Sequence, residues 1–271
     1  MKDLAADPRQ TLPRSEGRLQ IAMGRDGRLE DLFQKGCLKA LFPRNALPEV
    51  TLINTSGGIA GGDTLETEIR LAGQSKLSVS TQACERVYRS SEDALHGSVT
   101  TRLAASGSAE LCWMPQETIF YDGGRLKRRL EIDASDDARI LAVESILFGR
   151  LAMGETSIAG RLTDEVSLRV DGRLVWQDKT RLNGRISEIL DRPAVANGHK
   201  ASALLVFRDS NAHLHAERMV GLQTETSGCS LLAQDLLVAR YLAEDGLALR
   251  RALIPALTLL SGSSLPRCWR L

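Results

Sequence analysis

The chain has 271 residues, of which 43% are hydrophobic, 25% are charged and only 4% are aromatic, and its formal net charge is +1. This composition is typical of a globular protein with an aliphatic core, and the near-neutral charge provides no basic field to hold nucleic acid or an anionic membrane. We predict a flexible N-terminal arm over residues 1–17 and a single domain over residues 18–271. The arm lacks the apolar segment of a signal peptide, and no apolar run is long enough to span a bilayer, so we expect a cytoplasmic protein.

Apolar and polar side chains alternate along four segments, residues 65–71, 77–80, 126–132 and 166–170. Since successive side chains of a strand point to opposite faces, each segment predicts a strand with one buried and one wetter face. Turn dipeptides such as Asp171-Gly172 and Asn197-Gly198 separate the strands. The sequence therefore predicts a mainly β fold of many short strands, which we expect to be antiparallel.

Two segments have helical rather than alternating spacing, residues 142–153 and 229–245. Gly246 follows the second segment and is typical of the residue that ends a helix. The wide apolar stripe of this second helix, together with the apolar residues at 257–260, predicts an exposed apolar patch that needs a partner.

The segment NTSGGIAGGD, residues 54–63, is rich in glycine. Gly57 and Gly62 have the spacing of a P-loop, but Asp63 and Thr64 stand where a P-loop requires Lys and then Ser or Thr. A strand rather than a helix is predicted to follow, so a phosphate site is disfavoured. We interpret the segment as a tight turn in which Gly58 or Gly61 needs a positive φ or a close backbone approach.

Signatures of nucleophilic catalysis or of a stable metal site are missing from the sequence. There is no GxSxG motif, and the five cysteines include no CxxC pair, which argues against disulfides and a structural zinc site and favours a reducing compartment. His213 and His215, in a predicted strand, would share one face and bind nickel weakly, although two solvated histidines are the favoured interpretation. The basic run at residues 127–129 is interpreted as a solvated strand or turn rather than a phosphate-binding patch.

Several carboxylates lie beside apolar or glycine-rich sequence: Asp63, Glu85, Glu117, Glu144 and Glu155. A buried carboxylate is costly unless it is paired or hydrated. The structural interpretation of Glu144 is an ion pair with Arg89 or Arg150. The functional interpretation is a polar lining for a path along which a cation moves. The residues alone favour the ion pair.

Five segments, in order, resemble the motifs of one family. They are NTSGGIAGGD at residues 54–63, TQACERVYRS at 81–90, PQETIF at 115–120, ESILFGRLAMGE at 144–155 and PRCW at 266–269. Together they are similar to the conserved blocks of the UreD (UreH) family of urease accessory proteins. Thr55-Ser56, Glu85-Arg86 and Cys268 depart from the residues that are common at these positions in the family.

The resemblance implies a β-helicoid-like body with two α-helices, and a non-catalytic scaffold. It implies docking on urease apoprotein and on UreF, which recruits the GTPase UreG, and the passage of nickel toward the urease active site. On this basis we expect Asp63, Glu85, Glu144 and Asp178 to contribute carboxylates to an internal passage, with nickel in transit, no stable metal site and no stably bound cofactor. We expect no nucleic-acid or membrane partner.

A cytoplasmic carboxylate-dependent carbohydrate-active enzyme on a β-helical body is the alternative. Such an enzyme needs two carboxylates that face each other in a cleft, typically with aromatic platforms for sugar rings. Aromatic residues are scarce in this sequence, which disfavours the enzyme.

Overall fold

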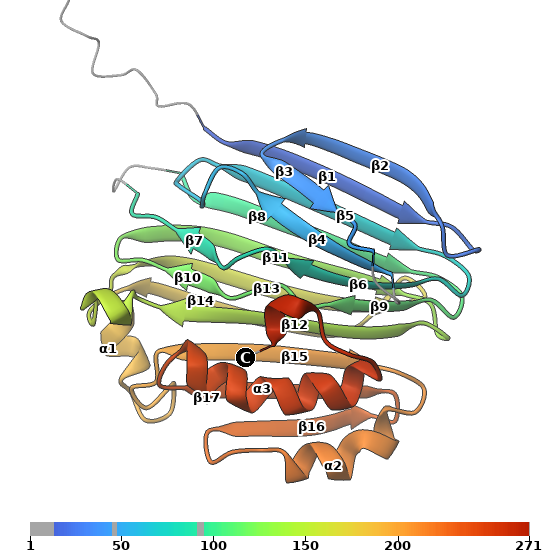
Figure 1. Ribbon diagram of the computed structural model, residues 1–271. Helices are drawn as coiled ribbons and strands as arrows, with labels where there is room; N and C mark the ends of the chain where they lie inside the picture. Colours follow the sequence, from blue (N-terminus) through green and yellow to red (C-terminus); the bar gives the residue numbers. More distant parts are fainter. Residues whose placement is uncertain (1–13, 45–47, 91–94, 271) are drawn as a thin grey trace, which may run out of the picture.

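A computed structural model describes residues 14–44, 48–90 and 95–270, in which two β-sheets face each other and the longest helix packs on one of them (Figure 1). Sheet A has seven strands in the order β14 (Arg173–Gly184), β13 (Gly160–Val170), β11 (Gly124–Ala134), β8 (Gly97–Ala105), β5 (Thr64–Leu71), β1 (Glu16–Met23) and β2 (Leu29–Gly36). Most of the arm predicted over residues 1–17 lies outside the described residues, and its last two residues begin β1.

Sheet B has ten strands. Eight of them follow the order β16 (Ser227–Ala233), β17 (Leu236–Ala243), β15 (Ala201–Arg208), β12 (Arg139–Phe148), β9 (Glu110–Trp113), β6 (Lys76–Thr81), β4 (Glu49–Asn54) and β3 (Leu38–Leu41). The short strands β7 (Glu85–Val87) and β10 (Thr118–Phe120) pair with each other, and β10 also pairs with β12. The mainly β prediction is confirmed.

Strand direction differs from the expected antiparallel arrangement. From β4 to β13 the chain passes back and forth between the sheets, so each strand pairs with the strand of the previous winding and runs parallel to it. Antiparallel pairs occur toward the ends of the sheets, as in β1–β2, β3–β4, β13–β14 and β15–β17. The same turn residues connect strands within a sheet or between two sheets, and for this reason the sequence pattern did not reveal the parallel winding.

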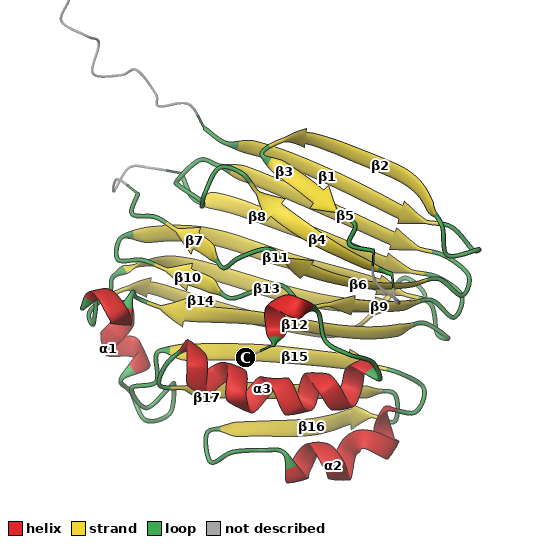
Figure 2. Cartoon of the chain, in the orientation of Figure 1, coloured by secondary structure: helices red, strands yellow, loops and turns green. Residues whose placement is uncertain are grey.

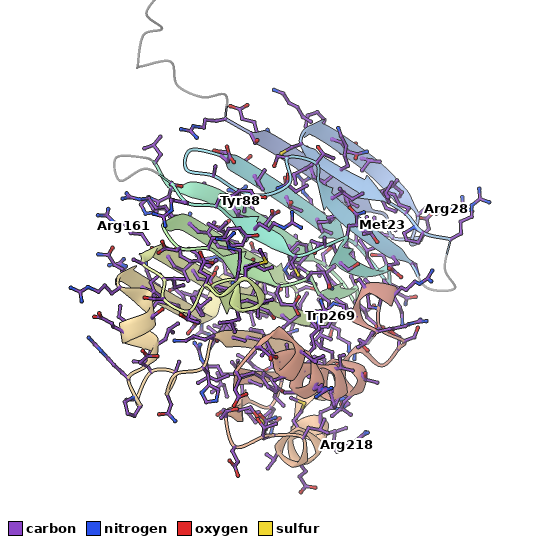
Figure 3. All side chains as sticks on the ribbon, turned by 60° about the vertical axis from the view of Figure 1, so that its left-hand side comes forward. Met23, Arg28, Tyr88, Arg161, Arg218 and Trp269 are labelled. Atoms are coloured by element: carbon purple, nitrogen blue, oxygen red, sulfur yellow. The ribbon has the colours of Figure 1, made fainter. Side chains whose placement is uncertain are left out.

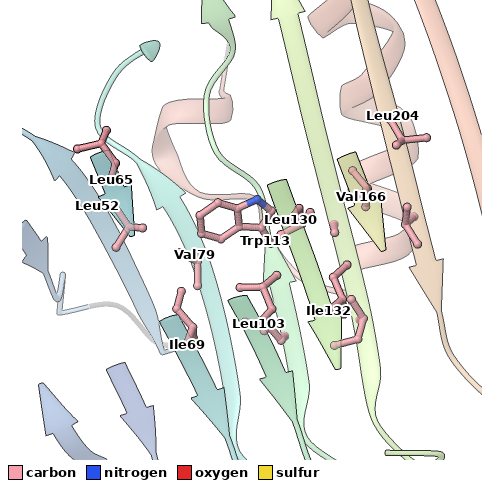
Figure 4. Packing of buried hydrophobic residues seen from close by; sticks show 14 of the residues in the cluster. Leu52, Leu65, Ile69, Val79, Leu103, Trp113, Leu130, Ile132, Val166 and Leu204 are labelled. Carbon is pink, nitrogen blue, oxygen red and sulfur yellow. The ribbon is translucent and has the colours of Figure 1, made fainter. Parts of the chain in front are cut away.

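The main hydrophobic core lies between the sheets (Figure 4). Alternating side chains of each strand enter it, as the pattern predicted. Sheet A contributes Leu65, Ile69, Leu103, Leu130, Ile132 and Val166, and sheet B contributes Leu52, Val79, Trp113 and Leu204. The opposite face of sheet A carries charged and polar side chains, so only sheet B is buried on both faces over its central strands.

The described residues contain three α-helices, α1 (Ile186–Leu190), α2 (Ala216–Gly221) and α3 (Gly246–Ser261), and three short 3₁₀ helices, η1 (Leu151–Met153), η2 (Ala212–His215) and η3 (Arg267–Trp269). The longest, α3, packs on the outer face of sheet B against β12, β15 and β17 (Figure 2). The Asp245 side chain caps it by accepting from the Ala248 N–H at 2.8 Å, and Gly262 ends it with φ of 64°. None of the described helices is long and apolar enough to cross a membrane.

Both predicted helices are wrong. Residues 142–153 form most of β12 and then the loop with η1, and residues 229–245 form most of the β16–β17 hairpin. β12 lies between the main core and α3, so both of its faces are apolar and the period of two disappears from the sequence. Asp245 and Gly246, interpreted as the end of a helix, instead begin α3.

The exposed apolar patch predicted at residues 229–245 and 257–260 is wrong for most of these residues. Leu257 and Leu260 of α3 are fully buried against sheet B. Within the predicted segments, Leu231 and Leu232 of β16 are exposed, and further exposed apolar side chains lie near other strands at the sheet edges: Leu29, Leu32, Phe33, Leu41 and Phe42. Of the residues predicted to form the stripe, only the two leucines of β16 remain exposed.

The glycine-rich segment forms a tight turn, as predicted. Gly58 has φ of +154°, and a Cβ there would lie 2.3 Å from Cε2 of Tyr88 and 2.7 Å from the carbonyl oxygen of Arg86. The turn therefore packs too closely on the segment that carries β7 for any side chain at Gly58.

Candidate functional site

Two cavities lie between the sheets. The first, cavity 1, has a volume of about 180 Å³, and the second, cavity 2, of about 580 Å³. Both exceed the space of about 10–15 Å³ that one water needs. Arg128 and Glu144 are the two described residues that line both cavities, so the cavities meet at this pair.

The junction is a buried cluster of three charged side chains from β11, β12 and β13. Nη1 of Arg128 lies 2.6 Å from Oε2 of Glu144. Nε and Nη2 of Arg128 donate to the two carboxylate oxygens of Asp164 at 2.8 and 2.7 Å. Trp113 Nε1 donates to Glu144 at 2.8 Å, and Arg128 Nη1 donates to Thr118 Oγ1 at 3.2 Å. The cluster is thus almost fully hydrogen-bonded.

Strand alternation explains why Arg128 points inward. Its neighbours on the same face of β11, Leu126 and Leu130, are both in the core. Arg128 is therefore buried, and the interpretation of residues 127–129 as a solvated run is wrong for this residue. The predicted partners of Glu144 were also wrong, since Arg89 pairs with Asp122 and Arg150 with Glu155.

The junction carries one positive and two negative charges. Burial raises the pKa of Glu144, an effect that Arg128 opposes and Asp164 reinforces. Although burial disfavours its charge, Asp164 and Glu144 hold the pKa of Arg128 above its usual value. The guanidinium therefore stays charged. The negative charge of the Glu144 carboxylate depends on Arg128 for neutralisation.

Glu85, on β7, lines cavity 1 at the end that reaches the surface, where Gln82 and Ala83 are exposed. Its carboxylate accepts from Asn54 Nδ2 at 3.0 Å and from the Arg86 N–H at 3.2 Å. Burial raises the pKa of Glu85. Among the described residues no cation lies within ion-pair distance of it, so this carboxylate is held in the wall without a salt bridge.

Cys84 also lines cavity 1. Burial and the neighbouring Glu117 carboxylate raise the pKa of its thiol to about 11. The thiol is protonated at neutral pH and donates to Glu117 at 3.3 Å. Since the thiolate is the form that binds metals, Cys84 is a weak ligand here.

Asp178 and Asp63 lie apart from the junction. Asp178, on β14, lines cavity 2 and pairs with Arg240 of β17, which links the two sheets. Asp63 lines neither cavity. Its carboxylate accepts from the Ser15 N–H at 2.8 Å and the Ala60 N–H at 2.7 Å, and so fixes the glycine-rich turn.

Segments of three family motifs, those at residues 54–63, 81–90 and 144–155, meet near Tyr88, which Figure 3 labels. The Tyr88 hydroxyl donates to the Gly57 carbonyl at 2.9 Å, and its ring meets Tyr121 edge-on at 5.4 Å. The Arg150 guanidinium lies over the Tyr121 ring at 4.4 Å and pairs with Glu155. Three separate motifs, together with Tyr121 directly after a fourth, thus contribute to one packed region beside cavity 1.

Arg250 of α3 connects the PQE motif to the C-terminal PRCW motif. It donates to both oxygens of Glu117 at 2.7 and 2.8 Å, and it also bonds the side-chain oxygen of Gln116. It donates to the carbonyl of Cys268 at 3.1 Å, and its guanidinium lies 5.3 Å from the centre of the Trp269 ring. Because Gln116 lines cavity 1, this network fixes part of the cavity wall.

The histidine pair is not arranged as predicted. Residues 212–215 form the 3₁₀ helix η2 rather than a strand, so His213 and His215 do not share a strand face. His215 packs edge-on against Phe207, and burial lowers its pKa. Over the described ranges, no group of three or more His, Cys, Asp or Glu side chains is placed to hold a metal ion.

The comparisons with known proteins decide the family. The family model described as "UreD urease accessory protein" matches residues 15–270. The chain belongs to the UreD family. It is 43% identical to the urease accessory protein UreD of Ruegeria pomeroyi over 243 residues, 89% of this chain and 94% of that protein. It is 38% identical to the UreD of Agrobacterium fabrum over 275 residues, 100% of this chain and 95% of that protein.

Sequence reasoning missed three members of the site, Arg128, Asp164 and Arg250. A signal for the first was available, because Leu126, Arg128 and Leu130 share one parity in a predicted strand. The role of Arg250 had no local signal, since its partner Glu117 lies far away in the sequence and the helix that carries Arg250 was not predicted.

Proposed function

We propose that this member of the UreD family is a non-catalytic, cytoplasmic scaffold that binds urease apoprotein and UreF, and UreG through UreF, and that passes nickel to the urease active site. The observation that carries the proposal is the pair of cavities between the sheets. Their walls contain three of the four predicted carboxylates, Glu85, Glu144 and Asp178.

The chemistry of the walls suits transit better than storage. A divalent cation inside a protein needs oxygen atoms or water to replace its hydration shell. The three carboxylates are spread along the cavities, so none of them forms a tight chelate that would hold the ion. A protonated Cys84 in the wall of cavity 1 fits the same requirement.

We propose a different role for Asp63, the fourth predicted residue. Its hydrogen bonds to Ala60 and Ser15 hold the turn at residues 54–63. Asn54 and Gly57 of this turn line cavity 1. Asp63 therefore shapes the entrance of the passage rather than contacting the ion.

The outer surface supports protein partners. β2 and β3 are the end strands of their sheets and carry exposed Phe33 and Leu41. Exposed apolar side chains on an edge strand favour association with another chain. The five free cysteines fit a reducing compartment. We propose no nucleic-acid or membrane partner and no resident cofactor.

The alternative of a carbohydrate-active enzyme receives less support. Glu144 and Asp164 are two interior carboxylates that both pair with the guanidinium of Arg128. Neither is free to act as an acid or a nucleophile on a sugar.

The passage is tested by filling cavity 2. Ser202 of β15 lines this cavity, and Ser202→Trp places a bulky uncharged ring in it. Ser167→Trp is the matched control, because Ser167 lies on the outer face of β13 and lines neither cavity. Each variant is co-expressed with urease, UreF and UreG, assembly is checked by co-purification, and the nickel content and activity of urease are measured.

We expect both variants to assemble, and only Ser202→Trp to leave urease short of nickel. Normal nickel content with an intact Ser202→Trp complex would refute transit through cavity 2. Equal losses from both variants would show that the tryptophan acts through assembly and not through the passage.

A further inference from the structure

Arg128 occupies the point at which the two cavities meet. Its guanidinium is bound on one side by Asp164 and on the other by Glu144, and its side chain is only 8% exposed. A cation that moves from cavity 1 to cavity 2 must pass the pair Arg128 and Glu144, because these two described residues line both. At that point it would meet a like charge.

We propose that Arg128 is the gate of the passage, and that a divalent cation crosses only by displacing the guanidinium from Glu144. This inference rests on the proposed function, since it concerns regulation of the same route. An arginine does not lose its proton in a protein, so the gate cannot open by deprotonation and the side chain must move.

The hydrogen bonds indicate which contact opens. Asp164 holds Arg128 through two parallel bonds, to Nε and Nη2, and Glu144 holds it through Nη1 alone. The bidentate contact with Asp164 is the stronger and the more geometrically specific of the two. Arg128 therefore stays on Asp164 while its Nη1 leaves Glu144, and the arriving cation takes over the compensation of Glu144. Once the ion moves on, the guanidinium returns and restores a compensated, closed junction.

The gate also explains how the junction avoids trapping the ion. Without a guanidinium, Glu144 and Asp164 would be two uncompensated carboxylates facing one space, and a divalent cation there would be held. Arg128 stays bound to Asp164 and competes with the ion for Glu144, so the ion is bound only weakly at the junction. The predicted consequence of removing the positive charge is retention of nickel, not faster flow.

The test measures nickel binding by the purified full chain, without urease. Wild type, Arg128→Met and Arg128→Lys are dialysed against NiCl₂, and bound nickel is measured by mass spectrometry. We expect Arg128→Met to bind nickel about tenfold or more tightly than the wild type, because a charge beside the ion has been removed. Arg128→Lys keeps the charge and should remain close to wild type. The double variant Arg128→Met with Glu144→Gln should bind nickel no more tightly than the wild type.

Arg128→Met leaves buried carboxylates unpaired and is at risk of unfolding. Arg128→His is therefore the second variant, since a protonated imidazole pairs with the carboxylates at mildly acidic pH and a neutral one can bind the metal at higher pH. Nickel should raise the melting temperature of Arg128→His at pH 8 and leave that of the wild type unchanged.

The proposal is overturned if folded Arg128→Met or Arg128→His binds nickel no better than the wild type, or if Arg128→Lys gains as much as Arg128→Met. These outcomes are separate from failure of the proposed function. If the Arg128 variants do not retain nickel but Ser202→Trp still leaves urease short of nickel, the proposed passage is supported and the proposed gate is wrong. If the variants retain nickel but Ser202→Trp has no effect, the junction is as described and the route does not deliver.

Discussion

The hydrogen bonds and the ion pair of Arg250 predict how its loss would change the free energy of unfolding. Arg250→Met removes the cation beside Glu117, whose side chain is only 2% exposed while that of Arg250 is 18% exposed. Breaking a buried ion pair by removing one partner costs about 3–5 kcal/mol. Because Arg250 is partly exposed, we expect the lower end, about 3 kcal/mol, or a melting temperature lower by about 6–12 °C in a protein of this size.

The assay is urea unfolding of the wild type, Arg250→Met, and Arg250→Met with Glu117→Gln. The double variant should recover much of the loss, because the buried group left behind is then neutral. The control is Arg102→Gln, which breaks the exposed pair with Glu131 and should cost no more than about 1 kcal/mol. A loss below that of Arg102→Gln, or an equal loss in the single and double variants, would refute the reasoning.

Three further predictions concern the turn, the pH dependence and the surface. Gly58→Val should destabilise the protein by about 2–6 kcal/mol through strain and contact with Tyr88, whereas Gly57→Ala, with open space around its Cβ, should cost about 1–2 kcal/mol. Unchanged thermal melting of Gly58→Val would remove the turn argument. The pKa of Glu85 is raised above its ordinary 4.5, so the folded state binds its proton more tightly, and stability falls as the pH rises through the folded pKa. Glu85→Gln should accordingly melt higher than the wild type at pH 7 and equally at pH 4, and a lower melting temperature at pH 7 would contradict the assignment. The exposed edge strands predict aggregation of the chain expressed alone and rescue by co-expressed UreF, measured as the soluble fraction; a soluble monomer without affinity for UreF would count against it.

Strands with one solvent-exposed face were predictable from the sequence. β5, β11 and β13 alternate because the outer face of sheet A is polar. The Asp171-Gly172 turn between β13 and β14 was also predictable, and its residues have φ of 47° and 76°, as a two-residue hairpin turn requires. β12 was not predictable, because α3 buries its second face and both faces of the strand are therefore apolar in the sequence. Whether two strands run parallel depends on which sheet the chain enters next, which local residues do not encode.

The site was predictable only in part. Glu144 was singled out because a carboxylate among apolar residues needs compensation, and the structure confirms that it is buried and paired. Its partner Arg128 comes from the opposite sheet, so the pairing depends on the packing of two sheets rather than on spacing along the chain. Asp63 was grouped with the others by its motif, and its position in the turn follows from backbone hydrogen bonds that a sequence does not show.

The most direct test of nickel transit is the nickel content of urease matured with Glu144→Leu. Glu131→Leu is the matched control, since Glu131 lies on the outer face of β11 and pairs with exposed Arg102. Both variants are co-expressed with urease, UreF and UreG, and co-purification establishes that the complex forms. Transit along the cavities predicts urease depleted of nickel with Glu144→Leu and fully loaded with Glu131→Leu. Fully loaded urease from an intact Glu144→Leu complex would contradict the account.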